Sequence, residues 1–295
     1  MSQSALFMFG ATGQVARAMA DRAREKRFEL TALARGDADL SDPAAIRAAI
    51  ARAPEGAVVV NAAAYTAVDQ AESEPELAKA INTIAPGVMA EAARERGLDF
   101  IHISTDYVFD GEKLAPYTEE DPTNPKGVYG RTKRDGERAV LAASEDSVIL
   151  RTSWVYSPYG KNFLKTMLRV GAERDELRVV DDQVGAPTSA HDIADGILKV
   201  CGVRARGPAA SGIFHLTGTG EASWADFADA IFDAQTEHWG RRPAVARIAT
   251  KDYPTPAARP ANSRLSCERL AREYGFRAPH WRESMTRVLS ALNAQ

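Results

Sequence analysis

Cysteine is scarce in this chain, which has only 2 in 295 residues. Cys201 and Cys267 are too few, and too far apart in the sequence, for a disulfide framework or for a zinc site with four ligands. We therefore expect both to be reduced thiols. Histidine gives no sign of a metal site either, because its 5 copies show no ligand spacing. We expect structural or surface roles for His102, His191, His215, His238 and His280.

Long apolar runs and an excess of one charge are missing as well. No segment is apolar over a length that would span a bilayer, and Met1–Ser4 leave no room for a charged leader before the first apolar segment. The net charge is −3, and the basic stretch at 22–27 is typical of a solvated helix face. These absences predict a cytoplasmic protein with neither a membrane nor a nucleic acid among its partners.

The chain instead alternates short apolar segments with helix-like stretches, and it is long enough to bury a sizeable core. Strands are predicted at 6–9, 28–33, 57–60, 100–104 and 147–152. Helices are predicted at 15–26, from Pro43 onward, and at 76–96, where Gly97 ends the last of them. This alternation predicts an α/β fold with a Rossmann-like, doubly wound parallel sheet and right-handed crossovers.

The regular alternation ends near residue 155. Further strands are predicted at 177–180 and 212–216, helices at 223–235, 266–274 and 281–292, and an extended loop at 253–260, where prolines exclude a helix. No repeat or low-complexity linker separates the two halves. We therefore expect a dinucleotide-binding domain at 1–155, completed by parts of 180–235, and a smaller, interwoven substrate-binding lobe mainly at 156–295.

A glycine turn follows the first predicted strand and reads Gly10-Ala-Thr-Gly13-Gln-Val-Ala16. Glycines allow the tight turn and let backbone N–H groups approach a pyrophosphate, and the small Ala16 lets the following helix lie close to the strand. A glycine-rich turn alone is a weak signal. Its position between a strand and a helix is the context that dinucleotide binding requires.

Tyr129 and Lys133 are four residues apart, so in a helix they share one face. A phenol titrates near pH 10, and a lysine ammonium in a cleft can lower that pKa enough for proton transfer near neutral pH. The spacing arises often by chance, and a solvated helix face is the alternative. Thr105 supports the catalytic interpretation, because its hydroxyl is predicted at a strand end, where it can bond a substrate oxygen or the Tyr129 phenol.

Small residues follow the third predicted strand in Asn61-Ala-Ala-Ala64. In an open parallel sheet, ligands bind outside the carboxyl ends of the strands. The alanines would let a flat cofactor lie against the backbone, although a tightly packed strand end would show the same residues.

With these segments assembled, the sequence resembles an extended short-chain dehydrogenase/reductase, and within that superfamily the dTDP-4-dehydrorhamnose reductase family. The resemblance covers nearly the whole chain. The general matches are at 10–15, 60–69, 71–76, 104–109 and 129–133, and the more specific ones at 150–156, 162–167, 182–188, 253–256 and 259–263.

The resemblance implies NADPH-dependent reduction of the 4-keto group of dTDP-4-dehydro-β-L-rhamnose to dTDP-β-L-rhamnose, a precursor of cell-surface polysaccharide such as lipopolysaccharide O-antigen. It assigns proton donation to Tyr129, with Lys133 on the nicotinamide ribose and Thr105 beside the sugar. The implied substrate-binding residues are Thr105, Asp106, Trp154, Arg259 and Asn262, with Arg259 expected on the diphosphate. The implied cofactor-binding residues are Gly10, Thr12, Gly13, Gln14, Val15, Arg35, Asp39, Leu40, Ala63, Ala64, Tyr65, Tyr129 and Lys133.

Two departures from the family pattern bear on cofactors. The second strand ends in Ala34-Arg35 where NADH-using relatives tend to carry an acid, so we predict a preference for NADPH, with NADH as the second candidate. Some relatives bind Mg²⁺ through glutamates, but the matching positions here are Ala18, His191 and Ala291. A magnesium site is therefore not expected, nor a dimer built on one, although a homodimer of another kind is left open.

Three other functions compete with this interpretation. A nucleotide-sugar dehydratase needs a further acid where Tyr107 stands. A regulatory subunit like that of methionine adenosyltransferase would bind a dinucleotide without turnover. A reductase of another nucleotide-linked keto sugar stays open, because the sequence does not indicate which nucleobase of the substrate is recognised. The adjacent Asp181 and Asp182 suggest a turn rather than an acid/base pair, since Tyr129 already supplies the acid.

Overall fold

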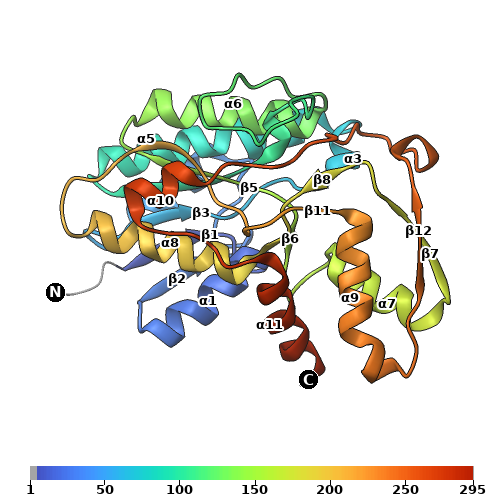
Figure 1. Cartoon of the computed structure of the whole chain (residues 1–295). Helices are drawn as coiled ribbons and strands as arrows, with labels where there is room; N and C mark the ends of the chain where they lie inside the picture. The colour runs from blue at the N-terminus through green and yellow to red at the C-terminus, as the bar shows by residue number, and fades with distance from the viewer. Residues whose placement is uncertain (1–4, 295) are drawn as a thin grey trace.

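The computed structural model describes residues 5–294 and has a six-stranded parallel sheet at its centre (Figure 1). Its strand order is β10-β5-β4-β3-β1-β2. The bounds are β1 Leu6–Phe9, β2 Leu30–Leu33, β3 Val58–Asn61, β4 Asp99–Thr105, β5 Val148–Thr152 and β10 Gly212–His215. The five strands predicted before residue 155 are thus present, with ends that shift by at most two residues, and the further strand predicted at 212–216 joins them as β10. Met1–Ser4, on which the expectation about a leader rests, lie outside the described residues.

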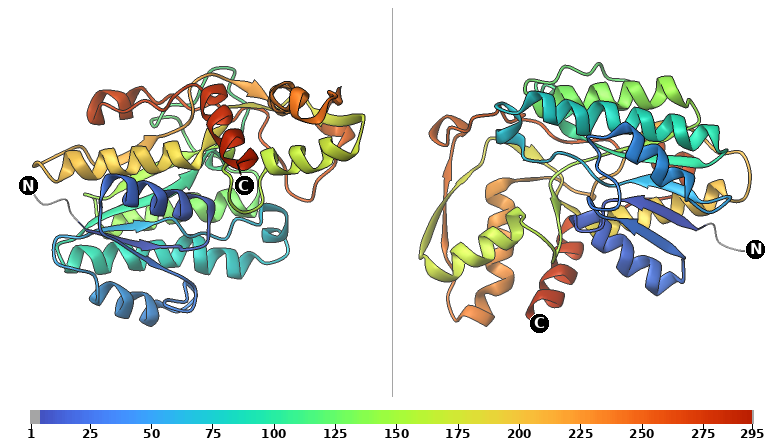
Figure 2. Two further views of the ribbon diagram at one scale, coloured as in Figure 1. Left: turned by 90° about the horizontal axis from the view of Figure 1, so that it is seen from below. Right: turned by 180° about the vertical axis from the view of Figure 1, so that it is seen from behind.

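Helices cover both faces of the sheet. One face carries α1 (Gln14–Lys26), α8 (Ala190–Arg204) and α10 (Glu268–Tyr274); the other carries α2 (Pro43–Ala51), α5 (Ala85–Glu95) and α6 (Val128–Ala143) (Figures 1 and 2). Alternate residues of each strand point to opposite faces. Met8 and Val60 therefore pack in the core under α1 and α8, and Phe9 and Val59 in the core under α2 and α5. The expected doubly wound α/β fold is confirmed.

The predicted helix at 76–96 is present at 75–95, but a π-helical turn interrupts its α-helical pattern. The chain forms α4 (Pro75–Lys79), a π-helical turn η1 (Ala80–Ile84) and then α5, after the short α3 (Val68–Ala71). Proline explains the interruption, because Pro86 has no N–H to donate to the carbonyl of Asn82, four residues earlier. The Asn82 carbonyl instead faces α6 at Gly136, where an added Cβ would lie 2.0 Å from its oxygen.

We expect Gly136→Ala to lower the free energy of unfolding by roughly 1–3 kcal/mol, because the methyl group would meet a backbone oxygen that cannot move without shifting the helix. Gly202→Ala in α8 is the matched control, since nothing lies within 4 Å of its added Cβ. That substitution should stabilise by about 0.5–1 kcal/mol through helix propensity. Urea unfolding measures both, and equal effects of the two substitutions would contradict this packing.

A second group of elements packs beside the sheet (Figure 2). The helices α7 (Phe163–Glu173), α9 (Trp224–Trp239) and α11 (Trp281–Asn293) share one core, to which Phe227, Phe232 and Trp281 contribute. The predicted strand at 177–180 is β7 (Glu176–Val180), which pairs only with β12 (Ala244–Ile248). The predicted helix at 223–235 is α9, and a capping box of Ser223 and Asp226 opens it.

Short elements join the two parts. They are η2 (Asp106–Val108), β6 (Val155–Tyr156), β8 (Val184–Gly185), β9 (Thr188–Ser189), β11 (Ala222–Ser223) and η3 (Thr250–Asp252). Because α8 and β10 return to the main sheet after β7, the chain crosses between the parts several times. The stretch 253–260 forms neither helix nor strand, as expected. Over residues 5–294 we find no helix with the length and hydropathy needed to cross a membrane.

Candidate active site

A cavity of about 910 Å³ opens at the carboxyl ends of β1, β3, β4 and β5. The strand order reverses direction between β1 and β3, and a crevice at such a switch point is where open α/β sheets bind ligands. All expected cofactor-binding residues line this cavity. It is also lined by Thr105, Asp106 and Trp154.

The glycine turn forms one wall. Gly10 has φ +105°, and an added Cβ would lie 3.2 Å from the backbone of Ala62, so the turn depends on glycine there. Gly13 is the N-cap of α1 and has no neighbour within 4 Å of an added Cβ. No side chain caps α1, so its first N–H groups are available to an anion.

Gln14 connects this turn to the loop 157–162. Its Oε1 accepts hydrogen bonds from Ser157 Oγ at 2.8 Å and from Asn162 Nδ2 at 2.9 Å. The same loop brings Gly160 and Lys161 to the cavity. Gln14 is thus placed to fix the position of the loop as well as to face a cofactor.

Arg35, Asp39 and Leu40 lie at another part of the lining. The Arg35 side chain is 82% exposed, and its Nη2 is 3.9 Å from Asp39 Oδ2. Asp39 also accepts hydrogen bonds from the backbone and the hydroxyl of Ser41, and the backbone bond is the main reason why its pKa is lowered. Arg35 is therefore exposed and only loosely paired at the cavity edge, where an anion can reach it.

Tyr129 and Lys133 both lie on α6 and both line the cavity, so the structure brings the pair together on one helix. Lys133 is 1% exposed, and its Nζ donates to the Ile103 carbonyl at 2.6 Å and lies 3.2 Å from His102 Nε2. Burial lowers the pKa of Lys133 to about 8, against an opposing effect of Glu137.

The structure does not show the expected lowering of the Tyr129 pKa. Burial raises the pKa of this phenol to about 12, although a hydrogen bond with the Thr105 side chain acts in the other direction. The physical reason is desolvation of the phenolate, while Lys133 points to the Ile103 carbonyl and His102. Tyr129 consequently stays protonated at neutral pH.

Thr105 and Asp106 lie where β4 meets η2. The Thr105 hydroxyl donates to Asp106 Oδ1 at 3.0 Å and accepts from the Tyr107 N–H at 3.2 Å. Asp106 is 3% exposed, and its Oδ2 has no hydrogen-bond partner among the described residues. Burial raises the pKa of Asp106 to about 6. A buried acceptor without a partner beside a cavity suggests a polar ligand.

The raised pKa of Asp106 predicts a pH-dependent gain from Asp106→Asn. The unfolded carboxyl titrates near 3.8 and the folded one near 6, so between these values the folded state binds more protons and stability falls as the pH rises. Above pH 6 the full cost, at most about 3 kcal/mol, is present. In thermal unfolding, Asp106→Asn should therefore be more stable than the unsubstituted protein at pH 7, with no advantage at pH 4. A difference independent of pH would contradict this.

Trp154, expected in the sugar pocket, lines the cavity, and Trp224 covers one face of its ring. It stacks on Trp224 with ring centroids 3.5 Å apart and planes 8° apart. Its φ of 47° lies in the left-handed region, which is costly for a bulky side chain. Gly185 allows this arrangement, because an added Cβ there would be 2.6 Å from the Trp154 ring.

Arg259 and Asn262, expected to bind substrate, are not brought to the cavity lining. Arg259 Nη2 pairs with Asp69 Oδ2 at 2.8 Å. The Asn262 amide donates to the Lys113 and Ala115 carbonyls, and its oxygen accepts from Arg264. Asn262 is buried with all these bonds made, so its position corrects the prediction: the residue holds two loops together.

Several cavity residues escaped the sequence analysis. They are Gln70, Glu74, Leu77, Ile81, Tyr107 and Lys161. Four of these lie at or near α3, α4 and η1, but only Leu77 and Ile81 fall within the predicted helix at 76–96. Pro75 and Pro86 were the available signals that this region is broken up.

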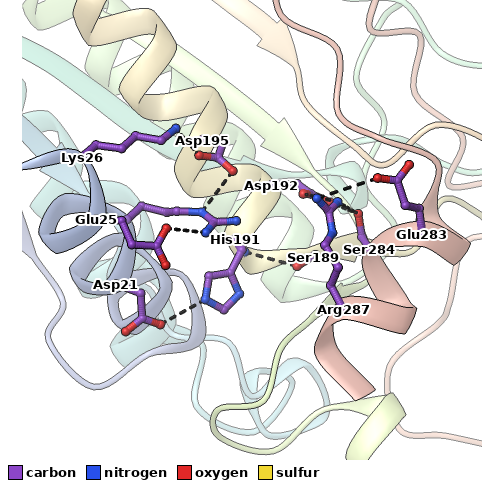
Figure 3. Close-up of polar contacts among 11 residues, drawn as sticks. Asp21, Glu25, Lys26, Ser189, His191, Asp192, Asp195, Glu283, Ser284 and Arg287 are labelled. Carbon is purple, nitrogen blue, oxygen red and sulfur yellow. Dashed lines mark hydrogen bonds and ion pairs between the residues drawn. The ribbon is translucent and has the colours of Figure 1, made fainter. Parts of the chain in front are cut away.

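The three positions considered above for a magnesium site are occupied by Ala18, His191 and Ala291, none of which is a carboxylate. Ala18 is buried, Ala291 is exposed, and His191 Nε2 is 3.0 Å from Asp21 Oδ2, between α1 and α8 (Figure 3). Asp192 beside it is bonded to Ser284 and Arg287 of α11 (Figure 3). No group of three or more histidine, cysteine or acidic side chains suited to a metal occurs within residues 5–294.

Comparison with known proteins agrees with this geometry. A family model described as RmlD substrate binding domain matches residues 4–294. The chain is 48% identical to the dTDP-4-dehydrorhamnose reductase of Sinorhizobium fredii, over 97% of each protein. The crystal structure of a dTDP-4-dehydrorhamnose reductase from Clostridium acetobutylicum matches with a TM-score of 0.90 and 39% identity, covering 98% of this chain and 99% of that one. The crystal structure of the dTDP-4-dehydrorhamnose reductase from Bacillus anthracis, in complex with NADP, matches with a TM-score of 0.89 and 32% identity. This match covers 98% of this chain and 100% of that one.

Proposed function

The chain belongs to the RmlD family of dTDP-4-dehydrorhamnose reductases, and from this membership we propose that it reduces the 4-keto group of dTDP-4-dehydro-β-L-rhamnose with NADPH. The observation that carries the proposal is the pair Tyr129 and Lys133 in the same cavity as the glycine turn. One side of the cavity is suited to a dinucleotide, and the other offers a protonated phenol. Together they give the two parts that a ketone reduction needs.

The residues fit NADPH in two respects. Gly10 and Gly13 leave space for a pyrophosphate against the backbone N–H groups of α1, and no acidic side chain stands in the first turn of that helix. Arg35 is exposed at the cavity edge, where an arginine favours a 2′-phosphate. When bound, the cofactor supplies the hydride.

Tyr129 acts as the proton donor. Burial keeps its phenol neutral, and a neutral phenol is the form that can give a proton to the sugar oxygen as that oxygen becomes an alkoxide. Thr105 bonds the same oxygen or the phenol, and its own position is fixed by Asp106 and the Tyr107 N–H. Lys133 holds the ribose of the cofactor. Asp106 and Trp154 contact the sugar.

Arg35→Ala should test the cofactor preference. We expect the KM for NADPH to rise by roughly one to two orders of magnitude, because an arginine–phosphate contact contributes about 1.5–3 kcal/mol. The KM for NADH should change less than threefold, since NADH lacks the phosphate. Steady-state kinetics with both cofactors decide this. An equal rise in the two KM values would show that Arg35 does not recognise the 2′-phosphate.

The test of the function is cofactor oxidation followed by absorbance with a panel of substrates. dTDP-4-dehydrorhamnose is expected to support turnover, and UDP- or GDP-linked keto sugars to do so much less well. Turnover with one of those sugars alone would make the protein a reductase of another nucleotide sugar. Tight NADPH binding with no turnover on any substrate would favour the non-catalytic regulatory subunit.

Two properties go with this function as proposals. We place the enzyme in the cytoplasm, where its cofactor and nucleotide sugars are found. A homodimer stays a prediction, and sedimentation equilibrium tests it.

A further inference from the structure

Behind Lys133 lies a chain of buried polar side chains that the proposed mechanism does not use. Asn61 ends β3 and is the register partner of His102 on β4, and Lys133 reaches β4 from α6. Asn61 Nδ2 is 3.1 Å from His102 Nδ1, and His102 Nε2 is 3.2 Å from Lys133 Nζ. All three residues are at most 1% exposed. At this degree of burial, each polar group needs a hydrogen-bond partner within the protein.

A backbone amide fixes the direction of the hydrogen bonds between these side chains. The Ala63 N–H donates to Asn61 Oδ1 at 3.1 Å, so the amide oxygen of Asn61 must face Ala63 and its NH₂ must face His102. The NH₂ donates to His102 Nδ1, which must then be unprotonated. A neutral imidazole carries its proton on the other nitrogen, so Nε2–H points at Lys133.

Lys133 can complete this arrangement only as a neutral amine. An ammonium has three donors and no acceptor, so one of its N–H groups would face the ring N–H and no hydrogen bond could form. The amine has a lone pair for Nε2–H and still donates to the Ile103 carbonyl at 2.6 Å. A protonated Lys133 instead needs an unprotonated Nε2 as acceptor. The ring proton must then be on Nδ1, which breaks the hydrogen bond with Asn61.

We propose that Lys133 and His102 form one proton switch, in which Lys133 becomes charged only when the ring proton of His102 moves from Nε2 to Nδ1. Charging takes up one proton from solvent in total: the Nε2 proton passes to Nζ, and Nδ1 receives the incoming one. Asn61 and His102 are thus positioning residues that act through Lys133. The effect of this switch on the rate of turnover rests on the proposed reductase function.

Among the titratable groups near Lys133, His102 is the one whose ring nitrogen lies within hydrogen-bond distance of Nζ. From α6, Glu137 faces it, but Glu137 is paired with Arg151 of β5 at 2.6 Å and accepts from Ser104 of β4. Tyr129 of α6 is neutral, and β3 offers only the Asn61 amide. Burial lowers the pKa of Lys133 to about 8, so both states of the switch are accessible near neutral pH.

Nitrogen NMR of ring-labelled histidine tests the switch directly and needs no substrate. In the unsubstituted protein, we expect the protonated nitrogen of His102 to change from Nδ1 at pH 6 to Nε2 at pH 10. In Lys133→Met, the amine is gone while the Asn61 bond remains, so the ring should stay protonated on Nε2 throughout. A His102 tautomer that does not change with pH in the unsubstituted protein, or that changes identically in Lys133→Met, would overturn the proposal.

Kinetics provide the second readout. His102→Phe removes the ring N–H that faces Lys133, so Lys133 should charge more readily, and the pH dependence of kcat/KM should shift upward by one unit or more, a tenfold change in proton affinity. His215→Phe is the matched control, a buried histidine on β10 outside the cavity lining, and should leave the profile in place. A lower kcat with an unmoved profile in His102→Phe would mean a merely structural role.

The two proposals fail separately. The expected tautomer change without any reductase turnover would reject the proposed function and leave the switch standing. Turnover together with a fixed His102 tautomer would reject the switch alone. If His102→Phe does not fold, the NMR comparison of the unsubstituted protein with Lys133→Met still decides.

Discussion

Replacing Tyr129 by phenylalanine is expected to lower kcat by roughly 10²–10⁴, the usual contribution of a general acid. The substitution removes only the hydroxyl, so the ring can keep its contact with Tyr107, whose centroid is 5.5 Å away. Cofactor affinity should change little, since the glycine turn and Arg35 are untouched. Stopped-flow single turnover with saturating NADPH measures the chemical step.

Tyr156→Phe is the matched control for losing a buried phenol. Its hydroxyl donates to the Trp281 carbonyl at 3.0 Å, outside the cavity lining. This variant should lose stability by about 0.5–1.5 kcal/mol, yet keep kcat within a factor of three. Comparable kcat losses in the two variants would mean that Tyr129 acts through the fold, and proton donation would have to be assigned elsewhere.

Lys133→Met is expected to reduce kcat/KM by roughly two orders of magnitude or more, because it removes both a donor to the cofactor ribose and the charge beside the proton donor. Unlike Tyr129→Phe, it should also weaken NADPH binding. Fluorescence titration separates this effect from that on kcat. Unchanged NADPH affinity would contradict the role of Lys133 on the ribose.

The double variant tests whether the two residues act as a unit. If Lys133 serves the proton transfer from Tyr129, then removing both should cost little more in kcat than removing Tyr129 alone. Fully additive losses would mean that the two side chains contribute independently, despite sharing one face of α6.

Much of this site follows from sequence because its signals are local. The glycine turn depends on Gly10 and Gly13 next to a strand, and the shared face of Tyr129 and Lys133 depends on helical spacing, so each is legible within a few residues. The presence of the main strands and their parallel arrangement follow equally from the alternation of apolar and helix-like segments.

What the sequence could not show depends on contacts between distant segments. The pKa of Tyr129 is set by burial rather than by its neighbour four residues on, and burial is known only once the cavity exists. Asn262 has the polarity of a ligand-binding residue, but its partners Lys113 and Ala115 lie about 150 positions away, at separations of 149 and 147. The role of His102 is hidden for the same reason, since only the pairing of β3 with β4 places it between Asn61 and Lys133.

The central claim is that the cavity transfers hydride from NADPH to C4 of the sugar while the chain provides the proton. It is tested most directly by turnover of dTDP-4-dehydrorhamnose with NADPH deuterated at its transferring position, followed by NMR of the product. The account predicts one deuterium at C4 and none at any other carbon. Product without deuterium at C4, or label at another carbon of the ring, would contradict it.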